Sequence, residues 1–121
     1  MPELPEVETV CRGLRGPLEG RRLRKVEARR KDLRIALPTD LAQRMTGRRV
    51  RAVRRRAKYI LLDLDDGTTV IMHLGMSGRI VMTQGRPNAI ERHDHLVIET
   101  EDDVFLRFND IFCNGLAGLT H

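Results

Sequence analysis

The Asp66-Gly67 dipeptide constrains the fold more than any other feature of this sequence, because it separates two runs of alternating apolar residues. An Asp-Gly pair in that setting is a strong signal for a tight β-hairpin. If these two residues alone form the turn, Asp65 faces Thr68 and Ile60 faces His73 across the two strands. The centre of the chain is therefore predicted to be an antiparallel pair of strands.

Other short segments with alternating or β-branched residues flank this hairpin. Together with it they predict strands over residues 22–29, 50–55, 58–64, 68–74, 79–83, 95–100 and 104–108. No internal repeat or linker divides them. Many short antiparallel strands with two helices predict a mainly β fold, an antiparallel β-sandwich with an N-terminal helix and a second short helix.

The N-terminal helix is predicted over residues 5–15, with Gly16 as its end. Its apolar stripe has helical spacing and consists of Val7, Val10, Cys11 and Leu14. Pro5 suits the first helical turn, and acidic residues there suit the positive end of the helix dipole. The second helix is predicted over residues 40–46, with Gly47 just past its end.

The composition restricts the class of protein. The chain has 121 residues, enough for one domain with a modest core. It contains no run of about 18 apolar residues and no secretion leader, so we expect a cytoplasmic protein without a membrane span. Cys11 and Cys113 are far apart in sequence, and neither a disulfide nor a metal site is expected from them.

Charge is distributed unevenly along the chain. Residues 21–56 contain 15 Lys or Arg and three acidic residues, a local charge of +12, whereas the remainder carries −7. A basic block of this kind is what binding to a phosphate backbone would use. The alternative is an arginine-rich surface that is simply solvated. The few aromatic residues argue against a platform for stacking single-stranded bases.

The N-terminus carries residues suited to covalent chemistry. Removal of Met1 would expose the secondary amine of Pro2, a nucleophile that can form an iminium with an aldehyde or acetal carbon. Glu3 follows directly, a carboxylate placed to move protons beside that nitrogen. The alternative reading is ordinary helix punctuation, because Pro and Glu both favour a first helical turn.

The hairpin register places Lys58 opposite Gly75, beside the segment His73–Met76. Along its own strand Lys58 shares one face with three apolar residues, Ile60, Leu62 and Leu64. Such a row would partly desolvate the ammonium group and free the amine for proton transfer. The alternative is an ordinary lysine that extends into solvent at a strand end.

The opening string, Met1-Pro2-Glu3-Leu4-Pro5-Glu6-Val7-Glu8-Thr9-Val10, resembles the start of formamidopyrimidine-DNA glycosylases, bacterial repair enzymes that excise oxidised purines. Residues 55–61 resemble the catalytic-lysine strand of that family, and residues 73–78 resemble its loop that enters the DNA. His93-Asp94-His95 and Arg107-Phe108-Asn109-Asp110 continue the resemblance in the same order. It covers about residues 1–110, which implies an N-terminal catalytic domain with those bounds.

The resemblance implies roles for individual residues. Pro2 is expected to be the nucleophile, Glu3 to protonate the sugar ring oxygen, and Lys58 to serve as a further acid–base group. The implied partner is double-stranded DNA containing oxidised purines or abasic sites, with the target nucleotide flipped out of the stack.

Three further residues are implied to contact that DNA. Met76, between Gly75 and Gly78, is expected to fill the vacated space, and His73 and His93 are expected to contact phosphates. Read without the resemblance, Met76 belongs to an ordinary hairpin loop and the histidines are surface hydrogen-bonding groups. No metal ligand set is assigned to His93 and its neighbours.

The resemblance ends after Asp110. Cys113 and Asn114 occupy the positions where the family has an arginine and a phenylalanine, and Phe112 is out of register with that pattern. Residues 111–121 are therefore expected to form a divergent tail. The helix–two-turns–helix and zinc-finger parts of the family are not in this sequence, so no cofactor is expected.

Three hypotheses remain open from the sequence. The first is a DNA glycosylase with strand-cleaving lyase activity, present here as a truncated catalytic domain whose activity is in question. The second is a non-catalytic DNA-binding remnant that uses the basic block. The third is a fragment without a function of its own.

Overall fold

The computed structural model describes residues 4–28, 41–88 and 94–118. These residues form two helices and six strands: α1 (Leu4–Leu18), β1 (Leu23–Ala28), α2 (Leu41–Met45), β2 (Val50–Arg56), β3 (Tyr59–Leu64), β4 (Thr68–Gln84), β5 (Asp94–Thr100) and β6 (Val104–Gly118).

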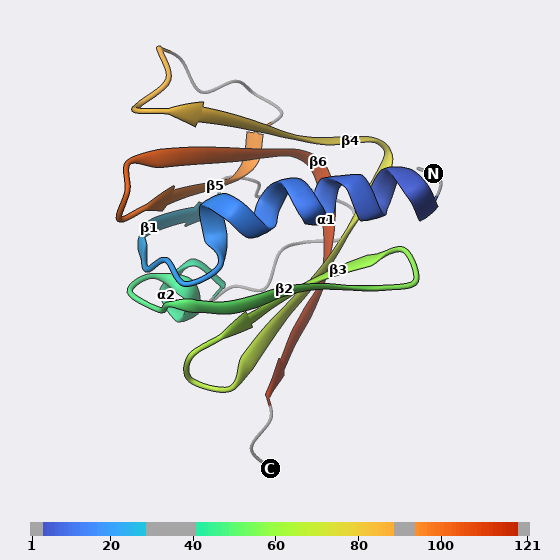
Figure 1. Cartoon of the computed structure of the whole chain (residues 1–121), viewed down its shortest axis with the longest axis horizontal. Helices are drawn as coiled ribbons and strands as arrows, with labels where there is room; N and C mark the ends of the chain where they lie inside the picture. Colours follow the sequence, from blue (N-terminus) through green and yellow to red (C-terminus); the bar gives the residue numbers. More distant parts are fainter. Residues whose placement is uncertain (1–3, 29–40, 89–93, 119–121) are drawn as a thin grey trace.

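The strands pair in the order β1-β5-β6-β4-β3-β2, and all neighbours are antiparallel. The long strands β4 and β6 curve through both halves of the sheet, so that it doubles over into two layers (Figure 1). A bridge between Arg22 and Arg49 joins the beginnings of the edge strands β1 and β2. The predicted antiparallel β-sandwich with an N-terminal helix and a second short helix is confirmed.

The core lies between the two layers and under α1. Its largest fully buried side chains come from both helices and from strands throughout the sheet: Phe108, Leu18, Leu23, Leu41, Met45, Ile60, Leu62, Leu64, Met72, Leu96, Ile98 and Leu106. Alternate residues of the strands supply them, as expected for a sheet with one face buried.

Helix α1 extends beyond its predicted end at Gly16 and reaches Leu18. The reason is packing: Leu18 is fully buried and continues the stripe of Val7, Cys11 and Leu14. Pro17 lies in the last turn of α1, where it lacks the N–H for one helical hydrogen bond. The turn that follows the helix contains Gly20, whose φ of 79° is the left-handed conformation common just after a helix C-terminus.

Side chains of α1 and of Glu19, in the turn after it, cover the free edge of β2. Val53 N–H donates to a Glu19 carboxylate oxygen at 2.7 Å, and Val53 C=O accepts from Arg15 Nε at 3.0 Å. The Cys11 thiol donates weakly to Arg54 C=O at 3.8 Å. Burial raises the pKa of this thiol, which keeps it protonated. An exposed sheet edge is thereby closed by a helix.

Strands β4 and β6 are longer than predicted. The predicted strands 68–74 and 79–83 belong to one strand, β4, and β6 continues ten residues beyond the predicted end at Phe108. The two strands pair with each other from Thr68 opposite Gly118 to Gln84 opposite Val104. The expected division after Asp110 falls inside β6.

The predicted register of the central hairpin is wrong by one residue. Ile60 pairs with Met72 rather than with His73, because the turn contains three residues, Asp65, Asp66 and Gly67. Gly67 has a φ of 89°, and its N–H bonds Leu64 C=O at 3.2 Å. A turn that ends in a left-handed glycine is the usual three-residue hairpin loop.

The short helix α2 agrees with its prediction. Its two buried residues, Leu41 and Met45, face the core, and Gly47 follows with a φ of 85°. In the described parts of the chain, neither helix is long and apolar enough to span a membrane.

Candidate active site and nucleic-acid interface

Lys58 lies in the two-residue turn between β2 and β3, together with Ala57. The Lys58 side chain is exposed, so the prediction that an apolar row desolvates it is wrong. The hairpin closes with Arg56 opposite Tyr59, which leaves Lys58 outside both strands. Ala57 has a φ of 53°, a left-handed conformation that is unfavourable for a residue with a Cβ.

Residues 75–78 form a wide bulge in β4. Leu74 pairs with Ile111 and Arg79 pairs with Asn109, so four residues of β4 stand opposite Asp110 alone. The sequence-predicted DNA-entering loop, which includes Met76, is thus a bulge within a strand. Bulges of this kind re-aim the chain next to functional sites. The backbone of His73 lies in the paired part of β4, opposite Phe112.

The remaining predicted site residues lie at chain positions adjoining the described elements. Pro2 and Glu3 precede α1, and His93 precedes β5; all three are outside the described residues. The first residue of β5, Asp94, pairs with Asn109, which also pairs with Arg79 next to the bulge. The beginning of β5 is therefore adjacent to the bulge across β6.

The fold brings these segments to one end of the molecule. Because Ile60 pairs with Met72, the turn that contains Lys58 and the bulge after Leu74 lie at the same end of the β3–β4 ladder. In Figure 1 the beginning of α1, the tip of the β2–β3 hairpin and the bend of β4 are on the same side of the molecule. Segments far apart in sequence thus share one region of the molecule.

A carboxylate on α1 ties the helix to the turn. Glu8 Oε1 accepts from Arg55 Nε at 2.7 Å, and Glu8 Oε2 accepts from Arg12 Nε at 3.1 Å. The hydrogen bond from Arg55, followed by that from Arg12, lowers the pKa of Glu8. Arg55 Nη1 also donates to Ala57 C=O at 2.7 Å. The second turn of α1 is thereby connected to the peptide immediately before Lys58.

Much of the basic block is paired with carboxylates of the acidic remainder. Among its described residues, six arginines form such pairs, Arg21 with Asp102, Arg24 with Glu99 and Asp103, Arg48 with Asp65, Arg49 with Glu101, Arg54 with Asp63 and Arg55 with Glu8. Each pair joins segments that are separate in the chain. The local charge of +12 therefore overstates the positive field available to a phosphate backbone.

Two basic side chains at the hairpin tip differ from the paired arginines. Arg56 and Lys58, which flank Ala57 at the turn, are exposed and form no ion pair within the described residues. Uncompensated positive charge thus coincides with the end of the molecule where the predicted site segments meet.

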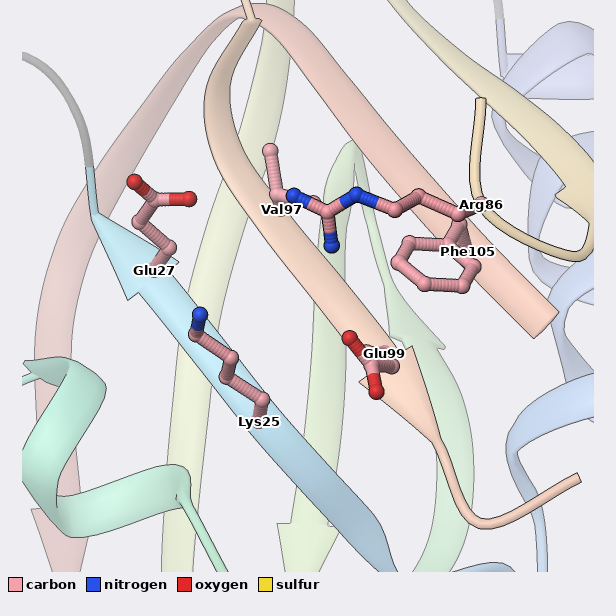
Figure 2. Close-up of a pocket in the computed structure, with 6 residues that line it drawn as sticks. All are labelled: Lys25, Glu27, Arg86, Val97, Glu99 and Phe105. Atoms are coloured by element: carbon pink, nitrogen blue, oxygen red, sulfur yellow. The ribbon is translucent and has the colours of Figure 1, made fainter. Parts of the chain in front are cut away.

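Figure 2 shows a depression on another part of the sheet, between β1, β5 and β6. It is lined by Lys25, Glu27, Arg86, Val97, Glu99 and Phe105. The Arg86 side chain extends across Phe105 toward Val97, and both apolar residues are buried (Figure 2). The volume of about 20 Å³ is room for one water molecule, and the four charges cancel. This depression is a packing feature, not a ligand site.

The contact between Glu8 and Arg55 could not be foreseen from the sequence. The spacing of Glu8 and Arg12 is a visible helical ion pair, but Arg55 lies 47 residues from Glu8. Only the pairing of α1 with β2 reveals that contact. Within residues 4–28, 41–88 and 94–118, no three His, Cys, Asp or Glu side chains cluster as metal ligands would.

Most of this sequence is similar to proteins of one family. Residues 1–113 match the family model for the formamidopyrimidine-DNA glycosylase N-terminal domain. The formamidopyrimidine-DNA glycosylase of Rhizorhabdus wittichii is 58% identical over 102 residues, 84% of this chain and 37% of that protein. That of Paracoccus denitrificans is 50% identical over 126 residues, 98% of this chain and 45% of that protein. The chain thus spans less than half the length of these relatives.

Solved structures give the same similarity. The Lactococcus lactis enzyme in complex with DNA containing an abasic site superposes with a TM-score of 0.84 at 29% identity, covering 98% of this chain and 45% of that one. The complex of the Lactococcus lactis enzyme with DNA containing FAPY-dG gives a TM-score of 0.83 at 29% identity, with 97% and 44% covered. The similarity extends over both layers of the sandwich and α1.

Proposed function

This chain belongs to the formamidopyrimidine-DNA glycosylase family, and we propose that residues 1–110 act as the catalytic domain of a base-excision-repair DNA glycosylase and AP lyase. Its substrate would be double-stranded DNA with an oxidised purine or an abasic site. Similarity to glycosylases solved with abasic and FAPY-dG DNA supports this substrate class. Because chromosomal DNA of bacteria lies in the cytoplasm, that is the proposed location.

The proposed chemistry uses an amine and acid–base groups. After removal of Met1, the Pro2 nitrogen attacks the anomeric carbon, the bond from that carbon to the base breaks, and the base leaves with the bonding electrons. Glu3 protonates the ring oxygen as the sugar opens, which gives an iminium between Pro2 and the sugar. The iminium acidifies the neighbouring sugar protons, and their removal expels the phosphates. Lys58 moves protons in these eliminations.

The proposed DNA contacts follow from base flipping. The target sugar must leave the helix before an amine can reach it. Met76, in the bulge of β4, would fill the space that the flipped nucleotide vacates. His73 and His93 would contact phosphates beside the lesion. These roles follow from the family motifs.

One observation carries the proposal: the beginning of α1, the Lys58 turn and the β4 bulge lie at one end of the molecule (Figure 1), and the beginning of β5 is adjacent to that bulge across β6. These are the segments to which the nucleophile, the lysine, the inserting residue and a phosphate contact are assigned. A binding remnant that relies on the whole basic block is less well supported, because six of its arginines are engaged with carboxylates.

The test is borohydride trapping on a duplex that contains an abasic site, at low salt, with intact mass measured on the same sample. Borohydride reduces the iminium to a stable amine, so we expect a covalent adduct on the chain that lacks Met1. Two proteins serve as controls in this experiment. Pro2→Gly keeps an N-terminal amine but lacks the secondary amine of proline. A chain that retains Met1 has no free Pro2 nitrogen. No adduct from the Met1-free chain would contradict the proposed function.

A further inference from the structure

The ion pair between Glu8 and Arg55 joins α1 to the end of β2, just before the turn that contains Lys58. Both side chains are about 29% exposed, and the Glu8 Oε1–Arg55 Nε distance is 2.7 Å. Charge-assisted hydrogen bonds in partly buried settings hold their geometry better than exposed ion pairs do. Glu8 is one helical turn from the beginning of α1, and Arg55 is three residues before Lys58.

Arg55 also fixes the turn itself. Its Nη1 donates at 2.7 Å to the carbonyl of Ala57, the carbonyl of the peptide that leads into Lys58. Ala57 holds a φ of 53° without being glycine, so this peptide is kept in a conformation that the residue disfavours on its own. Backbone strain of this kind persists only where surrounding contacts determine it, and it is concentrated at functional sites.

The guanidinium geometry matters for this arrangement. Arg55 uses two nitrogens at once, Nε toward Glu8 and Nη1 toward Ala57. A lysine amine at the same position is a single point donor and cannot reproduce the fork. Arg54 is a natural comparison: it makes a similar two-nitrogen contact, but with Asp63 on the neighbouring strand β3, and it has no contact with the turn.

We propose that Glu8 and Arg55 are positioning residues that act through Lys58, a proposal that rests on the function proposed above. Glu8 holds Arg55, and Arg55 holds the Ala57–Lys58 peptide. The pair sets the distance and direction of Lys58 relative to the beginning of α1, the element that Pro2 precedes. A displacement of about 1 Å between reacting groups can cost about a hundredfold in rate, so a device that fixes this relationship is functionally significant.

The first experiment compares Arg55→Lys with Arg54→Lys in single-turnover borohydride trapping on abasic-site DNA. Both variants keep their charge, and each loses one forked contact. We expect the saturating trapping rate of Arg55→Lys to fall about tenfold, with the half-saturating DNA concentration and the melting temperature near wild type. Arg54→Lys is expected to trap at the wild-type rate. A wild-type rate for Arg55→Lys, or equal losses in both variants, would overturn the proposal.

Two more measurements separate positioning from general stability. Adding Glu8→Gln to Arg55→Lys should cause no further loss of rate, because the two residues act as one unit. Nitrogen-15 relaxation of the Lys58 amide should show greater mobility in Arg55→Lys than in wild type or Arg54→Lys. If wild type itself gives no adduct, the proposed function fails, and the relaxation result alone decides the positioning role. Unchanged order at Lys58 then refutes it.

Discussion

Glu19, in the turn that ends α1, accepts a 2.7 Å hydrogen bond from the backbone N–H of Val53 in the edge strand β2. Val53 is buried at 2% exposure, and its N–H depends on this carboxylate for its hydrogen bond. An unsatisfied buried donor costs about 1–3 kcal/mol. The contact therefore protects the edge of the sheet as well as fastening the helix.

We expect Glu19→Ala to lower the free energy of unfolding by about 1–2 kcal/mol, because it leaves the Val53 N–H without an acceptor. Glu19→Gln keeps an acceptor oxygen and should lose less than half as much. Urea denaturation of the two variants and wild type measures both effects. Equal losses in the two variants would show that charge, not the hydrogen bond, is responsible.

The Arg54–Asp63 pair should give the chain a component of acid sensitivity. Hydrogen bonds from Arg54, and then from Thr69, lower the pKa of Asp63. A lowered folded-state pKa stabilises the fold above the unfolded value of about 3.9, and this stabilisation is lost as the pH falls through the folded-state pKa. Asp63→Asn should therefore be less stable than wild type at pH 7 by about 1 kcal/mol or less.

The same variant provides the pH control. Between pH 5 and pH 2 the difference in unfolding free energy between wild type and Asp63→Asn should shrink toward zero, as measured by urea denaturation at each pH. Asp65→Asn is a suitable comparison, because Asp65 is exposed and lies 3.8 Å from Arg48. A difference for Asp63→Asn that stays constant with pH would contradict the assigned cause.

Replacing Ala57 in the strained turn with glycine should increase the stability of the fold. Ala57 has a φ of 53°, which costs a non-glycine residue about 1–2 kcal/mol, partly offset by the greater flexibility of glycine in the unfolded chain. Ala57→Gly is expected to stabilise the fold by about 0.5–1 kcal/mol. Ala52→Gly, within β2, should destabilise by a similar amount. Thermal melts of both variants give the comparison.

Two glycines, one within α1 and one just after it, test where the helix ends. Gly13 is in the exposed middle of the helix with no atom within 4 Å of an added Cβ, so Gly13→Ala should stabilise by about 1 kcal/mol. Gly20 also has free space, but its φ is 79°, so Gly20→Ala should destabilise by about 1 kcal/mol. Opposite signs in chemical denaturation are the expected result. Two gains would place Gly20 inside the helix.

The sequence predicts the local elements well, because their signals are local. Alternation along each strand and the stripe of α1 require only neighbouring residues, and the spans of β1, β3 and α2 agree within two residues. The end of α1 was placed too early because the burial of Leu18 depends on the strands beneath the helix. A glycine signals a possible stop, and tertiary packing decides between Gly16 and Gly20.

Relationships between distant segments could not be obtained in this way. The hairpin register depends on whether the turn has two or three residues, and the Asp66-Gly67 pair suits both lengths. The length of β6 follows from the unpaired edge of β4, which no property of residues 111–118 reveals. Likewise the charge of the basic block suggests a broad DNA surface, whereas carboxylates 9 to 81 residues away pair with much of it.

The ion pairs make a specific prediction for DNA binding. Arg56 is exposed beside the Lys58 turn without an ion pair in the described residues, whereas Arg24 is bonded to Glu99 and Asp103. Each phosphate contact contributes about −0.9 to the slope of log K against log salt concentration. We expect Arg56→Gln to reduce the slope for an abasic-site duplex by about one contact and to weaken binding at every salt concentration.

Arg24→Gln should leave the slope unchanged, because a neutralised arginine releases no counterion from the DNA. Fluorescence anisotropy between 50 and 200 mM salt, roughly the range over which such slopes are resolved, makes the measurement. If Arg24→Gln lowers the slope as much as Arg56→Gln, the DNA extends over the paired arginines, and the interface is the whole basic block rather than the hairpin end of the sandwich.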